Sequence, residues 1–140
     1  MVIVDFRTES RFPVNRDRIR KTIEEVISRH GLKAKVEIGL SIVGDRKMSE
    51  LNGKYLKHEG TTDVLSFPLE SGGVISKRGT PDAPSGFVAP PDGVLHLGDV
   101  VISYPQAVKQ AAEKNELVDE EISILVEHGV LHLLGIHHEE

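Results

Sequence analysis

The feature that most constrains this fold is a long apolar segment near the carboxy terminus, where residues 119–134 predict one helix. After its first turn this helix is apolar on nearly every side, and such a helix must be buried by other secondary structure. Gly135 follows the segment where a helix end favours a left-handed residue, so we expect the helix to stop there. The chain must therefore supply a sheet or further helices that cover this segment from several sides.

The segments before this helix supply both. Val36, Ile38, Leu40 and Ile42 alternate strictly with other residues, which is the period of a half-buried strand. Further strands are predicted at residues 2–6, 64–67 and 94–102, and further helices after Asn15, from Asp45 or Ser49, and after Ser103. The sequence thus predicts an α+β fold, a mixed sheet of about four strands packed with helices, in a single domain at residues 1–140.

The sequence also predicts the character of two further segments. The helix that starts at Asp45 or Ser49 places Met48, Leu51 and Tyr55 on one side. Residues 70–93 hold five glycines and four prolines, which indicates a long irregular connection.

Composition limits the kinds of function that the chain can have. Aromatic residues make up 4% of the sequence and tryptophan is missing, which argues against base stacking as a main binding mode. Because there is no cysteine, any metal site must use histidine and carboxylate ligands. No segment approaches the roughly 18 apolar residues of a membrane span. We therefore expect a cytoplasmic protein, with neither a membrane nor a nucleotide cofactor as a partner.

Charge is unevenly distributed along the chain, although the total is −5. Residues 1–60 carry 13 Lys and Arg against 9 Asp and Glu, a net charge of +4, whereas residues 61–140 carry a net charge of −9. A basic half can meet a polyanion such as RNA, and it can equally be a solvated surface. The candidate RNA contacts are Arg16, Arg18, Arg20, Lys21, Lys54 and Lys57.

Three histidines near the end of the chain have the spacing of zinc ligands. His128 and His132 are four residues apart on the predicted helix, so both imidazoles lie on one side and can reach a single ion. A turn at Gly135 can bring His138 back over the same side. Three protein ligands leave a fourth position for water, whose pKa zinc lowers to about 7. We therefore expect one zinc ion per chain, used for hydrolysis rather than for structure alone.

The same histidine spacing occurs in the metzincin proteases, but one essential residue is missing here. In those enzymes a glutamate directly follows the first histidine and serves as the general base. This chain has Gly129 at that position, and glycine cannot accept a proton. Glu127, on the other side of His128, points about 100° away around the helix. The missing general base therefore argues against a metallopeptidase.

The histidine segment also resembles the signature of the YbeY family of endoribonucleases, which are rRNA maturation factors. The tail His-Gly-Val-Leu-His-Leu-Leu-Gly-Ile-His-His is similar to the family pattern His-Gly-x-Leu-His-Leu-x-Gly-Tyr-Asp-His. Two further segments match, Thr-Thr-Asp-Val-Leu-Ser-Phe-Pro at residues 61–68 and Leu-Gly-Asp-Val-Val-Ile-Ser at residues 97–103. The resemblance implies a zinc-dependent, single-strand-specific endoribonuclease that acts in rRNA processing and ribosome quality control.

The resemblance also implies roles for single residues. His128, His132 and His138 match the zinc ligands, and His128 is thereby also a candidate catalytic residue. Ser66 and Asp99 match motif positions near the metal and are further catalytic candidates. Asp99 could alternatively be a strand-edge carboxylate, and residues 61–68 could simply be a buried strand entered through a threonine turn.

This chain departs from the family pattern at two positions. His137 stands where the family usually has aspartate, which adds a neighbouring imidazole to the ligand segment. Leu56 stands where the family usually has a catalytically important arginine after a tyrosine. We expect Lys57 or His58 to supply the missing charge.

Three hypotheses about function follow. The first is metal-dependent hydrolysis of single-stranded or ribosomal RNA, with ribosomal proteins as further partners. The second is a metallopeptidase or amidase. The third is a ribosome assembly factor that binds rRNA without cutting it and holds zinc for structure. An open, water-accessible metal site favours the first hypothesis, and a closed fourth ligand favours the third.

Overall fold

The computed structural model describes residues 2–9, 11–32, 35–56, 60–69 and 94–136. Its elements are β1 (Val2–Thr8), α1 (Arg16–Arg29), β2 (Lys35–Val43), α2 (Asp45–Leu51), the π-helical turn η1 (Asn52–Leu56), β3 (Val64–Pro68), β4 (Val94–Ser103), α3 (Tyr104–Lys114) and α4 (Val118–Leu133). The four strands form one mixed sheet in the order β1-β2-β4-β3. Strands β1, β2 and β4 run parallel, and β3 is antiparallel to β4. The predicted α+β fold with a four-stranded mixed sheet is confirmed.

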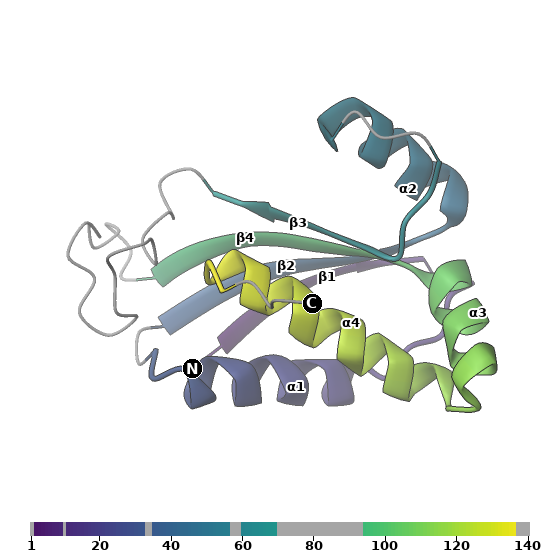
Figure 1. Ribbon diagram of the computed structural model, residues 1–140. Coiled ribbons are helices and arrows are strands. Elements are labelled where there is room, and N and C mark those ends of the chain that lie inside the picture. Colours follow the sequence, from purple (N-terminus) through teal and green to yellow (C-terminus); the bar gives the residue numbers. More distant parts are fainter. Residues whose placement is uncertain (1, 10, 33–34, 57–59, 70–93, 137–140) are drawn as a thin grey trace.

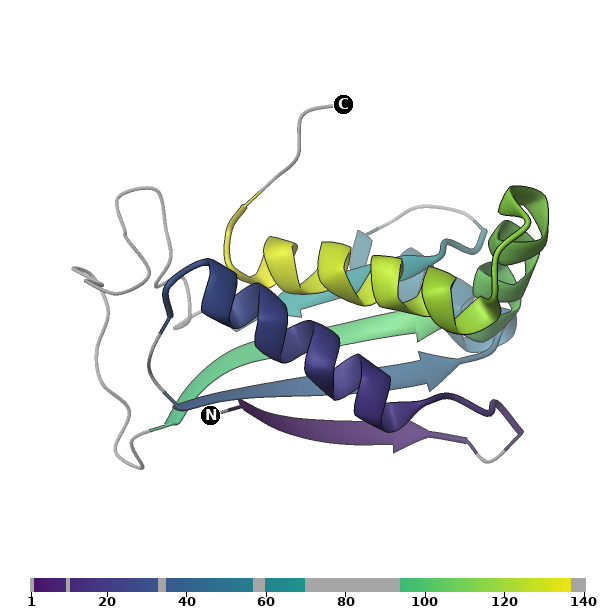
Figure 2. The same cartoon turned by 90° about the horizontal axis from the view of Figure 1, so that it is seen from below.

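Helices α1 and α4 cover one face of the sheet, side by side (Figures 1 and 2). The four alternating residues of β2, from Val36 to Ile42, are fully buried beneath them. The helix that the sequence required to be buried packs against α1, α3, β3 and β4. None of the helices in the described ranges is long and apolar enough to cross a membrane.

The helix ends follow local rules that the sequence shows. The Asn15 side chain accepts a hydrogen bond from the Arg18 amide, so it caps α1 as expected. The Ser103 side chain likewise accepts from the Gln106 amide at the start of α3, where Pro105 lies in the first turn. Polar side chains at these positions satisfy amides that have no partner inside the helix.

A second, smaller apolar cluster lies on the opposite face of the sheet. It consists of Met48, Leu65 and Val101, and it holds α2 against β3 and β4. Met48 is buried, whereas Tyr55, which the helical spacing predicts to lie on the same side, is 53% exposed. The reason is the change from α-helical to π-helical backbone after Leu51, which rotates the following residues away from the first helical face.

Candidate metal and RNA site on the last helix

His128 and His132 are exposed on helix α4, which is otherwise largely buried. Residues 129–131 between them are buried, as are Leu133 and Leu134 after them. The two histidines are separated by one helical turn, so they share a side of α4. An exposed pair of imidazoles on one side is accessible both to a metal ion and to a large substrate.

The turn that the sequence predicts at Gly135, after these histidines, is present. Gly135 has φ of +79°, its amide donates to the carbonyl of His132 at 3.0 Å, and the amide of Ile136 donates to Leu131 at 2.9 Å. This is the left-handed helix end that the sequence predicted. His137 and His138 lie outside the described residues. No group of three metal-binding side chains occurs within the described ranges, so the three-histidine zinc site stays a prediction.

Gly129 has a packing role that its place beside His128 does not reveal. A Cβ atom added to Gly129 would lie 2.5 Å from Cγ1 of Val100 on β4, far inside van der Waals contact. The glycine therefore lets α4 approach the sheet closely at this turn. A glutamate could not occupy this position without moving the helix, so the metzincin arrangement is excluded sterically as well as chemically.

Ser66 contacts the turn of α4 that carries the two histidines. Its hydroxyl donates a hydrogen bond to the carbonyl of Gly129 at 3.1 Å, which joins β3 to the histidine-bearing turn of α4. The contact brings together segments that are 63 residues apart in the chain. Ser66 therefore holds the turn between His128 and His132 against the edge of the sheet.

Asp99 is placed on the other face of the sheet. Its carboxylate lies over Gly39 of β2, where an added Cβ would collide with it, whereas the next residue, Val100, points toward α4. Successive residues of a strand point to opposite faces, so the sheet separates Asp99 from His128 and His132. The structure does not bring Asp99 together with these histidines, and the site proposed below does not include it.

The predicted basic contacts on α1 divide between two sides of that helix. Arg16 and Arg20 lie over the ring of Phe6 on β1, with their guanidinium carbons 5.2 and 5.4 Å from the ring centroid. Arg18 instead donates from Nε to the hydroxyl of Ser123 on α4 at 3.1 Å. These side chains therefore do not form one continuous basic patch.

The remaining predicted contacts lie in different surroundings. Lys21 borders a groove between α1 and α4 that also contains the carboxylates of Glu25 and Glu127. Lys54 lies on η1, with Nζ 5.2 Å from the ring centroid of Tyr55. Lys57 lies outside the described residues. The groove beside α1 is thus mixed in charge, whereas Lys54 sits next to an exposed aromatic ring.

Comparison with known proteins decides the family. Residues 4–140 match the sequence model of the family described as Endoribonuclease YbeY. The chain belongs to the YbeY family. Endoribonuclease YbeY of Dehalococcoides mccartyi strain BAV1 is 39% identical over 122 residues, 87% of this chain and 74% of the relative. The protein of the same name from Aquifex aeolicus is 38% identical over 128 residues, 91% of this chain and 72% of the relative.

A solved structure shows the same fold. The solution structure of a Thermotoga maritima protein aligns with a TM-score of 0.56 at 21% identity, covering 99% of this chain and 75% of that one. The family predicted from the tail motif and the fold predicted from the strand and helix patterns are therefore both confirmed.

The other end of α4 carries an ion pair that sequence spacing does not indicate. Glu121 is 1% exposed, and its Oε1 accepts a hydrogen bond from Lys114 Nζ of α3 at 2.8 Å. The hydrogen bond to Glu121, helped by the charges of Glu116 and Asp63, raises the pKa of Lys114 above its usual 10.5, against the opposing effect of burial. Only the α3–α4 corner brings these groups together, so spacing could not have revealed the pair.

Thr61 and Asp63, at the entry to β3, take part in a structural network. The Asp45 carboxylate accepts hydrogen bonds from the hydroxyls of Ser103 at 2.8 Å and Thr61 at 3.2 Å, and from the Gln106 amide. The Asp63 carbonyl accepts from the Ser103 amide at 2.9 Å. These bonds join α2, β3 and α3, which supports the interpretation of this motif segment as a strand entered through a threonine turn.

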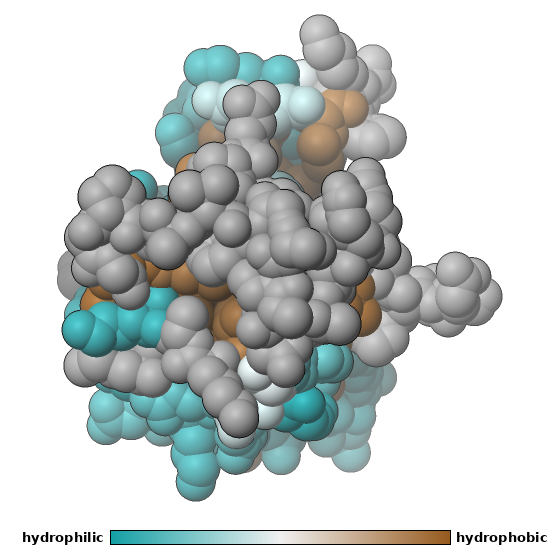
Figure 3. Space-filling view, turned by 90° about the vertical axis from the view of Figure 1, so that its left-hand side faces the viewer, coloured by the Kyte–Doolittle hydropathy of each residue, from teal (hydrophilic) through white to brown (hydrophobic). Residues whose placement is uncertain are grey.

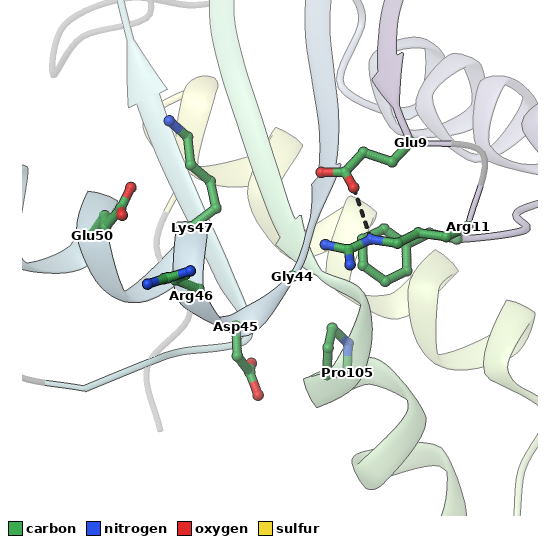
Figure 4. Close-up of a pocket in the computed structure, with 9 residues that line it drawn as sticks. Glu9, Arg11, Gly44, Asp45, Arg46, Lys47, Glu50 and Pro105 are labelled. Carbon is green, nitrogen blue, oxygen red and sulfur yellow. Dashed lines mark ion pairs between the residues drawn. The ribbon is translucent and has the colours of Figure 1, made fainter.

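A pocket next to this network lies away from the histidines, at the carboxyl ends of β1 and β2 (Figure 4). Arg11, Arg46 and Lys47 border it together with three carboxylates, and Arg11 is paired with Glu9 at 2.8 Å. His132 lies in the last turn of α4, near the opposite end of the sheet. The balanced charge of the pocket favours no particular ligand, and it plays no part in the site proposed below.

Proposed function

We propose that this protein is a zinc-dependent endoribonuclease specific for single-stranded RNA, acting in rRNA maturation and ribosome quality control. The observation that carries the proposal is the exposed pair His128 and His132 on a buried helix of a YbeY-family chain. The relatives bear the name endoribonuclease, which supports RNA as the substrate. Ribosomal RNA as the substrate would place the reaction in the cytoplasm, with ribosomal proteins as further partners.

In this proposal His128, His132 and His138 hold one Zn²⁺ through ring nitrogens. Imidazole nitrogens suit zinc, and the two histidines of α4 fit because they are exposed and one turn apart. Bound zinc would act as a Lewis acid and lower the pKa of a coordinated water. Ser66 keeps the ligand-bearing turn in place through its hydrogen bond to Gly129.

Basic side chains outside the histidine segment would bind and orient the RNA. Phosphate groups need cationic partners, and Lys54 lies beside β3, the strand that also carries Ser66. We further propose that Lys57 supplies charge where Leu56 replaces the arginine expected from the family pattern. Arg18 and Lys21 lie on the α4 side of α1 and can contact RNA that extends past His128.

Metal analysis combined with single-turnover cleavage tests this function. We expect about one zinc per chain and metal-dependent cleavage of a labelled single-stranded RNA. His132→Ala should remove both, whereas His137→Ala, one position from the proposed third ligand, should keep both. RNA binding without cleavage by zinc-loaded protein would instead favour the assembly factor. Metal-dependent cleavage of casein by clean protein would favour the peptidase.

A further inference from the structure

Tyr55 presents an aromatic ring on the surface next to the edge strand of the sheet. The residue is 53% exposed, yet its ring packs edge-on against Phe67 of β3, with the centroids 5.3 Å apart and the planes at 68°. Leu56 beside it is 45% exposed. An aromatic residue held at the surface in this way keeps much of its area available to a ligand.

Hydrogen bonds fix the base of the segment that carries Tyr55. Asn52, which is 5% exposed, donates from Nδ2 to the carbonyl of Gly60 at 3.0 Å. Next to it, the Thr61 hydroxyl donates to Asp45 at 3.2 Å. The π-helical turn therefore begins at an anchored residue, Asn52, which limits the entropy lost when a ligand binds the ring.

The surroundings of the ring are cationic and apolar at once. Lys54 Nζ lies 5.2 Å from the ring centroid, and the next residue after the ring, Leu56, adds an exposed apolar side chain. The upper part of Figure 3, where this region lies, shows hydrophobic and hydrophilic residues side by side. A planar aromatic group with adjacent phosphates matches such a surface, because the ring offers stacking and the lysine offers charge.

Tyr55 and the histidine-bearing turn of α4 contact opposite faces of the same strand, β3. Phe67 and Ser66 are successive residues, so Phe67 points to the Tyr55 side and Ser66 to the α4 side, where it bonds to Gly129. Within the described residues no further strand pairs with the outer side of β3. An extended polymer can therefore pass around this edge from Tyr55 to the proposed metal site.

We propose that Tyr55 is a stacking platform for one base of a single-stranded RNA, with Lys54 at an adjacent phosphate. This inference rests on the proposed function and adds how the substrate strand is held. Lys54 would exchange its weak contact with the ring for a phosphate and leave a ring face to the base. A single platform agrees with the low aromatic content of the chain. It is also independent of base identity, because every base has an aromatic face.

The composition of the chain allows a direct optical test. The sequence has two tyrosines and no tryptophan, and Tyr104 is stacked on Phe12 with the centroids 5.1 Å apart. In Tyr104→Phe the tyrosine emission comes from Tyr55, and in Tyr55→Phe it comes from Tyr104. Both variants are titrated in chelator, which prevents cleavage, with a short oligoadenylate and with an abasic oligoribonucleotide of the same length.

We expect the oligoadenylate to quench the emission of Tyr104→Phe and to leave that of Tyr55→Phe unchanged. The abasic strand should quench neither variant. Tyr55→Leu, which keeps an apolar contact with Phe67 but has no flat ring, should bind oligoadenylate at least about 5-fold more weakly, and Tyr55→Phe should bind it normally. A thermal melt of Tyr55→Leu checks that the fold is intact.

Two results would overturn the inference, and they are distinguishable. If wild type binds and cleaves RNA but the emission of Tyr104→Phe is not quenched and Tyr55→Leu binds normally, the platform is wrong and the nuclease stands. If wild type binds no RNA, the platform fails together with the proposed function.

Discussion

The two ends of α4 carry polar groups on the same side of the helix but place them in opposite environments. Glu121, near the start, is 1% exposed and paired with Lys114, whereas His128 and His132, near the end, are exposed. A buried carboxylate requires a partner, because desolvation penalises its charge. An exposed imidazole carries no such cost and can bind a ligand. We therefore expect one end of the helix to maintain the fold and the other to hold the proposed metal site.

Removing a histidine should separate activity from stability most strongly. We expect His132→Ala to lower RNA cleavage by roughly 10³-fold or more, because metal activation contributes several kcal/mol to the transition state. Its free energy of unfolding in chelator should change by less than about 0.5 kcal/mol, since the side chain is exposed. Single-turnover kinetics and urea titration measure the two quantities. A large loss of stability would mean that this end of α4 also maintains the fold.

Adding a methyl group between the two ends should disturb the contact of α4 with the sheet. Gly129→Ala places Cβ 2.5 Å from Val100 Cγ1, and we expect about 1–3 kcal/mol of destabilisation from overpacking, despite the better helix propensity of alanine. Combining it with Val100→Ala should give a smaller loss than the sum of the single variants, because the second change makes room. Strict additivity in urea titration would contradict this close contact.

At the buried end, the pH dependence of stability should report the ion pair. The pKa of Lys114 is raised above 10.5 in the folded protein, so its stabilisation is fully present below that pH and is lost as pH rises through the folded-state pKa. Unfolding midpoints of wild type should therefore fall above about pH 10.5 more steeply than those of Lys114→Met.

The same lysine variant also tests the division of roles along the helix. Lys114→Met should be less stable than wild type at neutral pH, because it leaves Glu121 buried without its partner. Its folded fraction should still cleave RNA at the wild-type rate. A matched control is Lys109→Met, an exposed lysine on the same helix α3, which should change neither property.

The smallest effect is expected at the contact that joins β3 to the histidine turn. Ser66→Ala removes the hydrogen bond to Gly129, and we expect a loss of about 0.5–1.5 kcal/mol in urea titration. Because Ser66 positions the turn, cleavage should fall modestly, and Ser66→Thr should restore part of it. A loss of cleavage comparable to that of His132→Ala, with stability retained, would instead give Ser66 a direct catalytic role.

Local patterns determined much of this protein. Three features depend only on residues that are close in sequence, so the sequence alone predicts them. They are the alternation in β2, the helix caps Asn15 and Ser103, and the left-handed Gly135. The sequence also predicts that His128 and His132 form a pair, since helical spacing alone places both on one side of α4.

Only the tertiary structure determined which side chains from distant segments come together. The sheet places Asp99 on the far face from the histidines, and the α3–α4 corner buries Glu121 against Lys114. The π-helical turn exposes Tyr55, which helical spacing alone places on the same side as the buried Met48. In the sequence, Gly129 indicates only that the glutamate base of the metzincins is missing. In the structure, the same glycine lets α4 approach Val100 of β4 closely. Spacing along a chain fixes the direction of a side chain within its own element, but only packing between elements fixes what that side chain meets.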